Sequence, residues 1–287
     1  MQDLALSVFF ASLIFVIFKL YNTYRVETFY AIIANYFVAS LCGFSFYNGD
    51  IKLLEIPEKK WFFGTLIIGI LFIVIFNLMA ATAQRIGVSV ASVATKMSLV
   101  IPVIFGIFAY NELLSPIKII GIILALVSVY FTSYKEKSVK IDKSTLYLPF
   151  LIFIGAGVID TGIKYVQEVH LNETEFSLFS ATAFGFAAIS GLLYIIIISF
   201  KKPLQVNYKN IIGGIVLGIP NYYSIYFLMR ALQNDEFTSA AIFTINNVAI
   251  VMVCTLLGII LFKEKISIKN WGGIVLAIIS ILLVALF

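Results

Sequence analysis

The 287-residue sequence is 61% hydrophobic and only 12% charged, with a mean hydropathy of +1.04. Soluble domains carry about 25% charged residues, so this composition excludes a soluble globular protein and predicts one that lies in a lipid bilayer. The formal net charge of +5 is distributed over short connections and forms no clustered basic face, which argues against a nucleic-acid partner.

Apolar runs long enough to cross a bilayer recur along the whole chain. A membrane helix needs about 20 mostly apolar residues, whereas transmembrane strands would show alternating runs of about 10 residues. Charged and turn-rich breaks divide the sequence into ten predicted spans, at 4–21, 28–47, 61–83, 89–110, 116–134, 147–166, 176–200, 211–232, 238–262 and 268–286. The predicted fold is therefore an all-α membrane protein of about ten transmembrane helices.

The second and third spans each contain one amide in an otherwise apolar helix, Asn35 in "IIANYF" and Asn77 in "VIFNLMA". Polar side chains in membrane helices usually face the bundle interior. We therefore treat both as candidate substrate-binding residues.

The fourth span contains Lys96, about 10 Å inside the apolar stretch "SVASVATKMSLVIPVIFG". A charge at this depth costs on the order of 3 kcal/mol on insertion scales, so something should compensate it. One interpretation is structural, in which Lys96 snorkels to the nearer interface or pairs with Asp160. The other is that Lys96 faces a water-filled cavity and binds an anionic group of a substrate. Pro102 frees the carbonyl of Ser98 and marks either a packing kink or a broken helix that exposes backbone to a ligand.

The sixth span contains Asp160 and Lys164, which share one helical face because they are four residues apart. They form either a self-neutralising pair or a site in which Asp160 carries a coupling proton.

Further polar groups lie in the eighth and ninth spans. "GIPNYYSIYF" combines Pro220 with Asn221 and Tyr222, and "FTINNVAIV" contains Asn246 and Asn247. Amide side chains both donate and accept hydrogen bonds, so they can orient a ligand or join two helices. We consider Asn221, Tyr222, Asn246 and Asn247 as candidate substrate-binding residues, with helix-to-helix bonding as the alternative.

An internal repeat organises the chain into two halves, predicted at 1–134 and 146–287 with a connecting loop at 135–145. The stretch "NELLSPIKIIGIILALVSVY" matches "KEKISIKNWGGIVLAIISIL", and the polar and small residues that coincide are Glu112 with Glu264, Ser115 with Ser267, Gly121 with Gly273, and Ser128 with Ser280. In this register Val248 is the counterpart of Lys96. Because five spans is an odd number, the two copies must enter the membrane in opposite orientations, as inverted repeats do. The role predicted for the two glutamates is structural, in matching hairpins.

The stretch "ATAQRIGVSVASVATKMSLVIPVIFG", echoed by "RALQNDEFTSAAIFTINNVAIVMVC", resembles the repeated unit of EamA-type ten-span transporters in the drug/metabolite transporter superfamily. The resemblance covers essentially the whole chain. It implies a secondary active transporter of small metabolites, often an exporter of amino acids or related compounds, and leaves the substrate unidentified. Two inverted repeats would enclose a central cavity with alternating access, and transport would use an existing gradient, of the substrate itself, of protons or of sodium.

Other classes of function lack their usual parts. The sequence has no HExxH, GxSxG or GxxxxGK[ST] motif and no cysteine and histidine cluster. We therefore expect no enzyme activity, no cofactor and no metal. The alternative function is a membrane-embedded enzyme or flippase that acts on a lipid-linked substrate, for which Asp160 and Lys96 would be the only candidate groups.

The distribution of basic residues predicts the orientation. Connections after odd-numbered spans hold about 13 Lys and Arg residues, and the alternate connections hold about six. The positive-inside rule then places the odd connections in the cytoplasm and both termini outside, whereas termini-inside is usual among the proteins that the sequence resembles. The expected location is the cytoplasmic membrane of a bacterium, and the oligomeric state stays open.

Overall fold

The computed structural model describes residues 2–47, 49, 51–110, 115–133, 145–171, 175–200, 207–232 and 239–286. Its α-helices are α1 (Gln2–Tyr24), α2 (Thr28–Ser45), α3 (Phe62–Arg85), α4 (Val88–Met97), α5 (Val100–Tyr110), α6 (Pro116–Ser133), α7 (Tyr147–His170), α8 (Phe176–Ser199), α9 (Tyr208–Leu232), α10 (Ser239–Phe262) and α11 (Ile268–Leu286). A short 3₁₀ helix, η1 (Leu53–Glu58), lies in the connection between α2 and α3.

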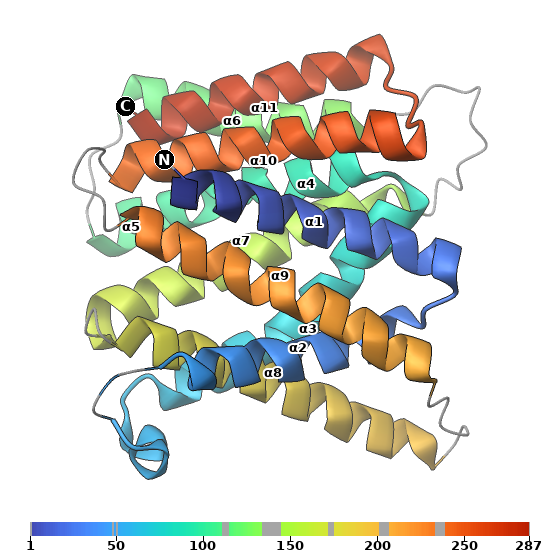
Figure 1. The fold of residues 1–287 in the computed structure, drawn as a ribbon. Coiled ribbons are helices and arrows are strands. Elements are labelled where there is room, and N and C mark those ends of the chain that lie inside the picture. The colour runs from blue at the N-terminus through green and yellow to red at the C-terminus, as the bar shows by residue number, and fades with distance from the viewer. Residues whose placement is uncertain are drawn as a thin grey trace.

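The predicted ten spans are confirmed within the described residues. Eight helical segments have the length and composition to cross a membrane, and α4 with the start of α5 counts as one of them. Two shorter apolar helices, at Ile119–Thr132 in α6 and Ile268–Val284 in α11, complete the set. Both chain ends lie at the same end of the bundle, as an even number of spans requires (Figure 1).

Helix packing follows the inverted repeat. The packing of α2 on α9 has its counterpart in α8 on α3, and α1 on α9 corresponds to α7 on α3. Likewise α1 on α10 corresponds to α7 on α4 and α5. These contacts between the halves are thus repeated with the two halves exchanged, as in a pseudo-two-fold arrangement. The packing of α1 on α3 has no equally extensive counterpart between α7 and α9.

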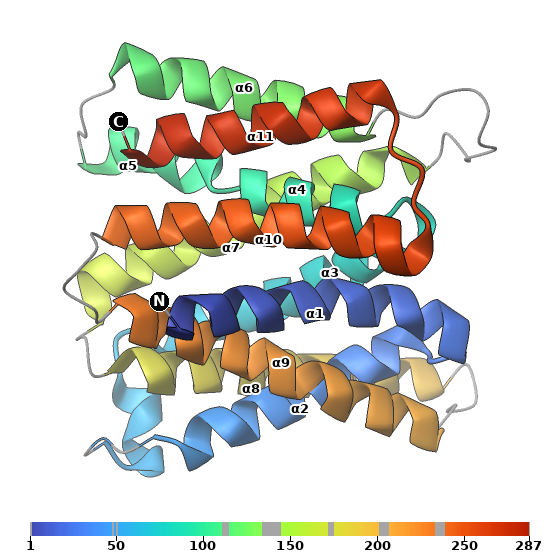
Figure 2. The ribbon, with the colours of Figure 1, turned by 45° about the horizontal axis from the view of Figure 1, so that its top comes forward.

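The helices divide into two bodies, each built from both halves. The six-helix body contains α1, α2, α3, α7, α8 and α9, and the four-span body contains α4, α5, α6, α10 and α11 (Figure 2). One apolar cluster is centred on Phe18, Tyr36 and Phe184 of the six-helix body and extends into α4 and α10. A second is centred on Met97, Val251 and Ile281 of the four-span body and includes Phe153 of α7. The two bodies meet where α4 packs on α7 and α3, where α5 packs on α7, and where α1 packs on α10.

Glycines allow the helices of the six-helix body to approach closely. A Cβ atom at Gly214 of α9 would lie 2.8 Å from the Ala31 carbonyl oxygen of α2. At the equivalent crossing, a Cβ atom at Gly69 of α3 would lie 2.8 Å from the Ala183 carbonyl oxygen of α8. Membrane helices pack through such small residues because lipid provides no hydrophobic drive for their association.

The repeat-matched glycines of the four-span body do the same. Gly121 of α6 faces the backbone of α11, where a Cβ atom would lie 3.2 Å from the Val284 nitrogen, and Gly273 of α11 faces α6, 2.6 Å from the Thr132 nitrogen. Ser280 Oγ also donates to the Gly121 carbonyl, at 2.7 Å. These coinciding sequence positions therefore mark the place where α6, the last helix of the first half, crosses α11, the last helix of the second half.

Candidate functional site

The fourth span is interrupted between α4 and α5, at Ser98 and Leu99. Pro102 has no amide hydrogen, so the Ser98 carbonyl oxygen cannot accept the helical bond that this residue would otherwise give. It accepts instead from the Ile101 amide, at 2.9 Å. The bond spans three residues rather than four, which tightens the chain locally and ends α4 at Met97.

Lys96 lies in the last turn of α4, directly before this break, and it is half-buried. Its ammonium group interacts electrostatically with the carboxylate of Asp160 on α7. No direct ion pair within 4.0 Å joins the two groups in the described part of the chain. The opposite charges therefore interact across the boundary between the four-span body and the six-helix body without direct contact.

Asp160 is exposed although it does not lie on the lipid-facing side of α7. The large apolar residues of α7 that face outward include Ile154, 54% exposed, and Val158, 46% exposed. Two residues beyond Val158, Asp160 is rotated by about 200° on the helix, onto the side of the buried residues Phe153 and Ala156. Its exposed side chain is therefore directed away from the lipid-facing side of α7.

Ser98 joins the break to this carboxylate. Its Oγ lies 3.1 Å from Asp160 Oδ2 and 2.5 Å from the Thr95 carbonyl oxygen. A hydroxyl group has one hydrogen, so it donates to one of these acceptors at a time. Ser98 can therefore bind Asp160 or release it without moving the backbone.

The opposite end of α4 is capped by Glu264, from the connection between α10 and α11. Its carboxylate accepts from the Val88 amide at 2.7 Å and from the Ser89 hydroxyl at 2.8 Å. A negative charge at a helix N-terminus compensates the unpaired amides and the helix dipole. Gly87, which precedes the helix with φ of +151°, leaves room for this carboxylate, since a Cβ atom would lie 2.9 Å from Glu264 Oε2. The predicted counterpart Glu112 lies outside the described residues.

A basic residue extends this cap to the six-helix body. Lys19 of α1 donates to the Gln84 carbonyl of α3 at 3.0 Å and interacts electrostatically with Glu264. The amide of Gln84 in turn donates to the Phe18 carbonyl at 3.0 Å and to Thr28 Oγ1 at 2.9 Å. At this end of the molecule, the electrostatic interaction between Lys19 and Glu264 therefore links the two bodies.

Asn247 lies on the face of α10 that is directed to α4. It is two helical turns from Cys254, a buried thiol that interacts with Lys96 and lies beside Ser92. Residues seven apart share a helical face, about 10 Å apart along the axis. Because α4 and α10 run in opposite directions, this shift carries Asn247 toward the level of Lys96 and the break. Its side chain is half-buried.

The other predicted amides bond to the protein itself. Asn246 accepts from the Ser7 hydroxyl at 3.1 Å, which joins α10 to α1. Asn77 donates to the Ile73 carbonyl of its own helix at 2.7 Å and remains half-buried. Asn221 donates to Asn35 at 3.1 Å, and both are almost fully buried between α9 and α2. None of these hydrogen bonds involves Lys96 or Asp160.

Tyr222 belongs to an aromatic cluster at the end of α9. Its ring stacks on Phe46 and on Tyr226, with centroids 5.9 Å and 6.0 Å apart, and meets Tyr223 edge to face at 5.4 Å. Of the predicted site residues, the structure thus brings Lys96 and Asp160 together and orients Asn247 toward them. Sequence reasoning connected Ser98 only with the proline and did not predict its contact with Asp160.

Comparisons with known proteins agree with this architecture. A sequence model of the EamA-like transporter family matches residues 4–134 and 144–286. A protein of Haemophilus influenzae, described only as uncharacterized, is 29% identical over 261 residues, which cover 88% of this chain and 86% of that protein. A protein of known crystal structure superimposes with a TM-score of 0.59 at 16% identity, over 100% of this chain and 97% of the other, which shows a shared fold.

Proposed function

Because the chain belongs to the EamA-like transporter family and is a multi-pass membrane protein, we propose that it is a secondary active transporter that exports small metabolites such as amino acids or related compounds. The observation that carries the proposal is the interrupted fourth span, which presents Lys96 and Ser98 to Asp160 inside the bundle. Substrate sites of secondary transporters are typically formed near the bilayer midplane by discontinuous helices.

Each polar group has a distinct role in this site. Lys96 binds the carboxylate or phosphate of the substrate, and Asn247 donates to or accepts from it. Asp160 carries the coupling proton, since a carboxylate inside a membrane bundle can exchange charge for neutrality. Ser98 donates to Asp160 when that group is ionised. Neither Walker motif residues nor a loop long enough for a nucleotide-binding domain occurs in the sequence, so an ion or substrate gradient drives transport.

Alternating access follows from the two bodies. Lys96 and Asn247 belong to the four-span body, and Asp160 belongs to the six-helix body. A substrate that contacts both draws the bodies together around itself. If the bodies open at the end where Lys19, Gln84 and Glu264 lie, Lys19 and Glu264 must move apart and lose their electrostatic interaction.

Ligand-induced thermal stabilisation of the purified protein tests the substrate site. A panel of amino acids, organic acids, sugar phosphates and cationic compounds is measured on the wild type, on Lys96→Met and on Lys265→Met, a control at an exposed lysine in the α10–α11 connection. We expect an anionic or zwitterionic compound to raise the Tm of the wild type and the control but not of Lys96→Met. Equal stabilisation of all three proteins would show that Lys96 does not bind substrate.

Transport by reconstituted protein tests the coupling role. Asp160→Asn should abolish accumulation driven by an imposed pH gradient while exchange of labelled for unlabelled substrate continues, because the asparagine keeps the shape of the site but carries no proton. Proton-driven accumulation at the wild-type rate would contradict the assignment of Asp160.

We further propose that the protein lies in the cytoplasmic membrane of a bacterium, with the connection between α1 and α2 on the cytoplasmic side. Single cysteines at Thr23 and at Glu58, in a background without Cys42 and Cys254, report the two sides of the membrane. A membrane-impermeant maleimide should label intact cells at Glu58→Cys only. Labelling at Thr23→Cys instead would reverse the orientation.

A further inference from the structure

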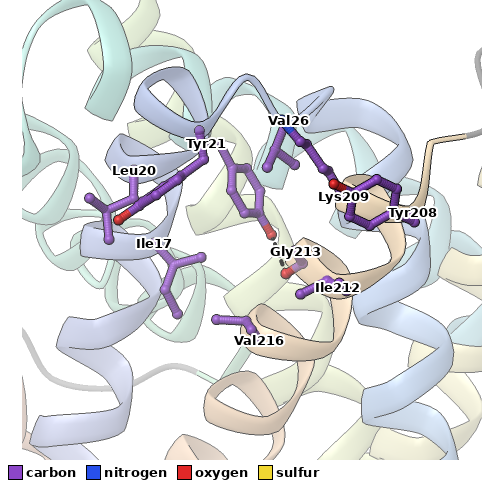
Figure 3. A pocket seen from close by; sticks show the side chains of 10 residues that line it. Ile17, Leu20, Tyr21, Val26, Tyr208, Lys209, Ile212, Gly213 and Val216 are labelled. Carbon is purple, nitrogen blue, oxygen red and sulfur yellow. Dashed lines mark hydrogen bonds between the residues drawn. The ribbon is translucent and has the colours of Figure 1, made fainter.

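An apolar groove of about 330 Å³ lies between the C-terminal end of α1 and the N-terminal end of α9 (Figure 3). Ile17 and Leu20 of α1 form one wall, and Ile212 and Val216 of α9 form the other. Ile212 is 53% exposed and Val216 is 49% exposed. In a membrane protein such exposed apolar side chains of a span contact lipid, so the groove opens sideways to the hydrocarbon of the bilayer.

The base of the groove is held by a direct contact between the two helices. The Tyr21 hydroxyl donates to the Gly213 carbonyl at 2.8 Å, as Figure 3 shows. Gly213 itself has no side chain, and a Cβ atom there would lie 2.9 Å from Val26. The groove is therefore a defined cavity between two packed helices and not a gap left by their separation.

The mouth of the groove carries positive charge. Lys209 is one of its lining residues, and Arg25 lies in the turn between the lining residues Tyr24 and Val26. Both are exposed, and neither forms an ion pair with a residue that the structure describes. Glu27 is the acidic residue of this turn, so the three side chains sum to a net positive charge.

Two tyrosines place this mouth at the surface of the bilayer. Tyr24 is 64% exposed and Tyr208 is 69% exposed, and both line the groove. Tyrosine is enriched at the level of lipid headgroups, where its ring contacts hydrocarbon and its hydroxyl contacts water. The groove thus presents apolar walls at the depth of acyl chains and cations at the depth of headgroups.

We propose that this groove is a binding site for an anionic phospholipid, with one acyl chain between α1 and α9 and the headgroup phosphate at Lys209 and Arg25. Basic pockets between membrane helices bind anionic headgroups in this way. A water-soluble ligand would find few polar partners on these walls, whereas an acyl chain gains about 0.8 kcal/mol for each methylene that it buries. The site is separate from Lys96 and Asp160, and it does not depend on what the protein transports.

Native mass spectrometry of the detergent-solubilised protein, titrated with phosphatidylglycerol or phosphatidylcholine, tests this site. We expect the wild type to bind phosphatidylglycerol more tightly. Lys209→Gln should weaken that binding about five-fold, the equivalent of about 1 kcal/mol for one lysine near an anionic surface. Lys265→Gln, which removes an exposed lysine at the same end of the bundle but outside the groove, should have little effect. Equal losses in the two variants would show general charge attraction and overturn the headgroup contact.

A second pair of measurements tests the acyl chain. Ile212→Trp fills the groove from its lipid-facing wall and should reduce binding of both lipids, while soluble glycerol phosphate should not displace bound phosphatidylglycerol. Val216→Trp gives an independent filling variant, and thermal unfolding in the same detergent identifies a variant that is misfolded. Unchanged binding in a folded filling variant, or displacement by glycerol phosphate, would overturn the proposal.

Discussion

The fourth span of the first half and its repeat counterpart in the second half have different structures. The first consists of α4 and α5, interrupted at Ser98, with Lys96 at the break. The second is α10, one helix of 24 residues with Val248 at the position that corresponds to Lys96. Pro102 explains the difference, because Cys254 occupies the corresponding position and has the amide hydrogen that a continuous helix needs.

This difference separates what the repeat conserves from what it does not. Gly121 and Gly273 make equivalent close contacts between α6 and α11, so the repeat specifies the architecture. The charge, the helix break and the hydroxyl that reaches Asp160 occur in one copy only. The candidate chemistry therefore lies where the two copies depart from symmetry.

Removing the charge of Lys96 should have the largest effect on substrate affinity, and placing a lysine in the other copy should not restore it. Lys96→Met should lower affinity for an anionic substrate by roughly 30-fold or more, the loss expected when one partner of a charge interaction in a binding site is removed. The double variant Lys96→Val with Val248→Lys should not recover it, because Asp160 faces α4 and the transplanted lysine has no helix break beside it. Calorimetric titration measures both, and recovery in the double variant would mean that the two copies are interchangeable.

Removing the cap of α4 should have the next largest effect. Glu264→Ala leaves the Val88 and Ser89 amides without their carboxylate and should destabilise the protein by about 2 kcal/mol, since hydrogen bonds to a charged group are lost. Thermal unfolding in detergent measures the change. Glu58→Ala, an exposed carboxylate in η1, is the control that should leave Tm unchanged. Equal Tm values for the two variants would show that the cap contributes no stability.

Closing the helix break should weaken substrate binding without unfolding the protein. Pro102→Ala restores an amide that can bond the Ser98 carbonyl and extend α4 into α5, so we expect affinity to fall about five-fold and amides 98–103 to exchange more slowly with deuterium. Pro220→Ala is the matched control, because α9 is already continuous through Pro220. An identical response to both substitutions would mean that the break is not part of the site.

Substitutions of the two adjacent amides of α10 should have the smallest effects on stability and on substrate affinity. Asn246→Ala removes the acceptor of the Ser7 hydroxyl and should cost about 1 kcal/mol in stability with substrate affinity retained. Asn247→Ala should reduce affinity a few-fold and leave Tm unchanged. Reversed effects would exchange the roles of the two residues.

Sequence patterns predicted the spans, the inverted repeat and Lys96 as an unusual group, because hydropathy and self-similarity are local properties of the chain. The sequence offered Asp160 as one possible partner of Lys96, but it did not predict that Ser98 contacts this carboxylate. The pairing of Asn35 with Asn221 joins residues 186 positions apart. Such partners depend on how helices cross, which composition and periodicity do not encode. The same limit applies to Pro220, which lies inside a continuous helix, whereas Pro102 follows a break.

The composition of the two bodies has a consequence for how the protein is made. α2 packs mainly on α9 and α8, and α1 packs mainly on α9 and α10, so these partners begin at residues 176, 208 and 239. During synthesis, the first two helices can therefore complete their packing only after most of the chain has been inserted. Neither half can complete a body alone, so a ribosome that stops at the connecting loop leaves an assembly intermediate with its main interhelical surfaces still facing lipid.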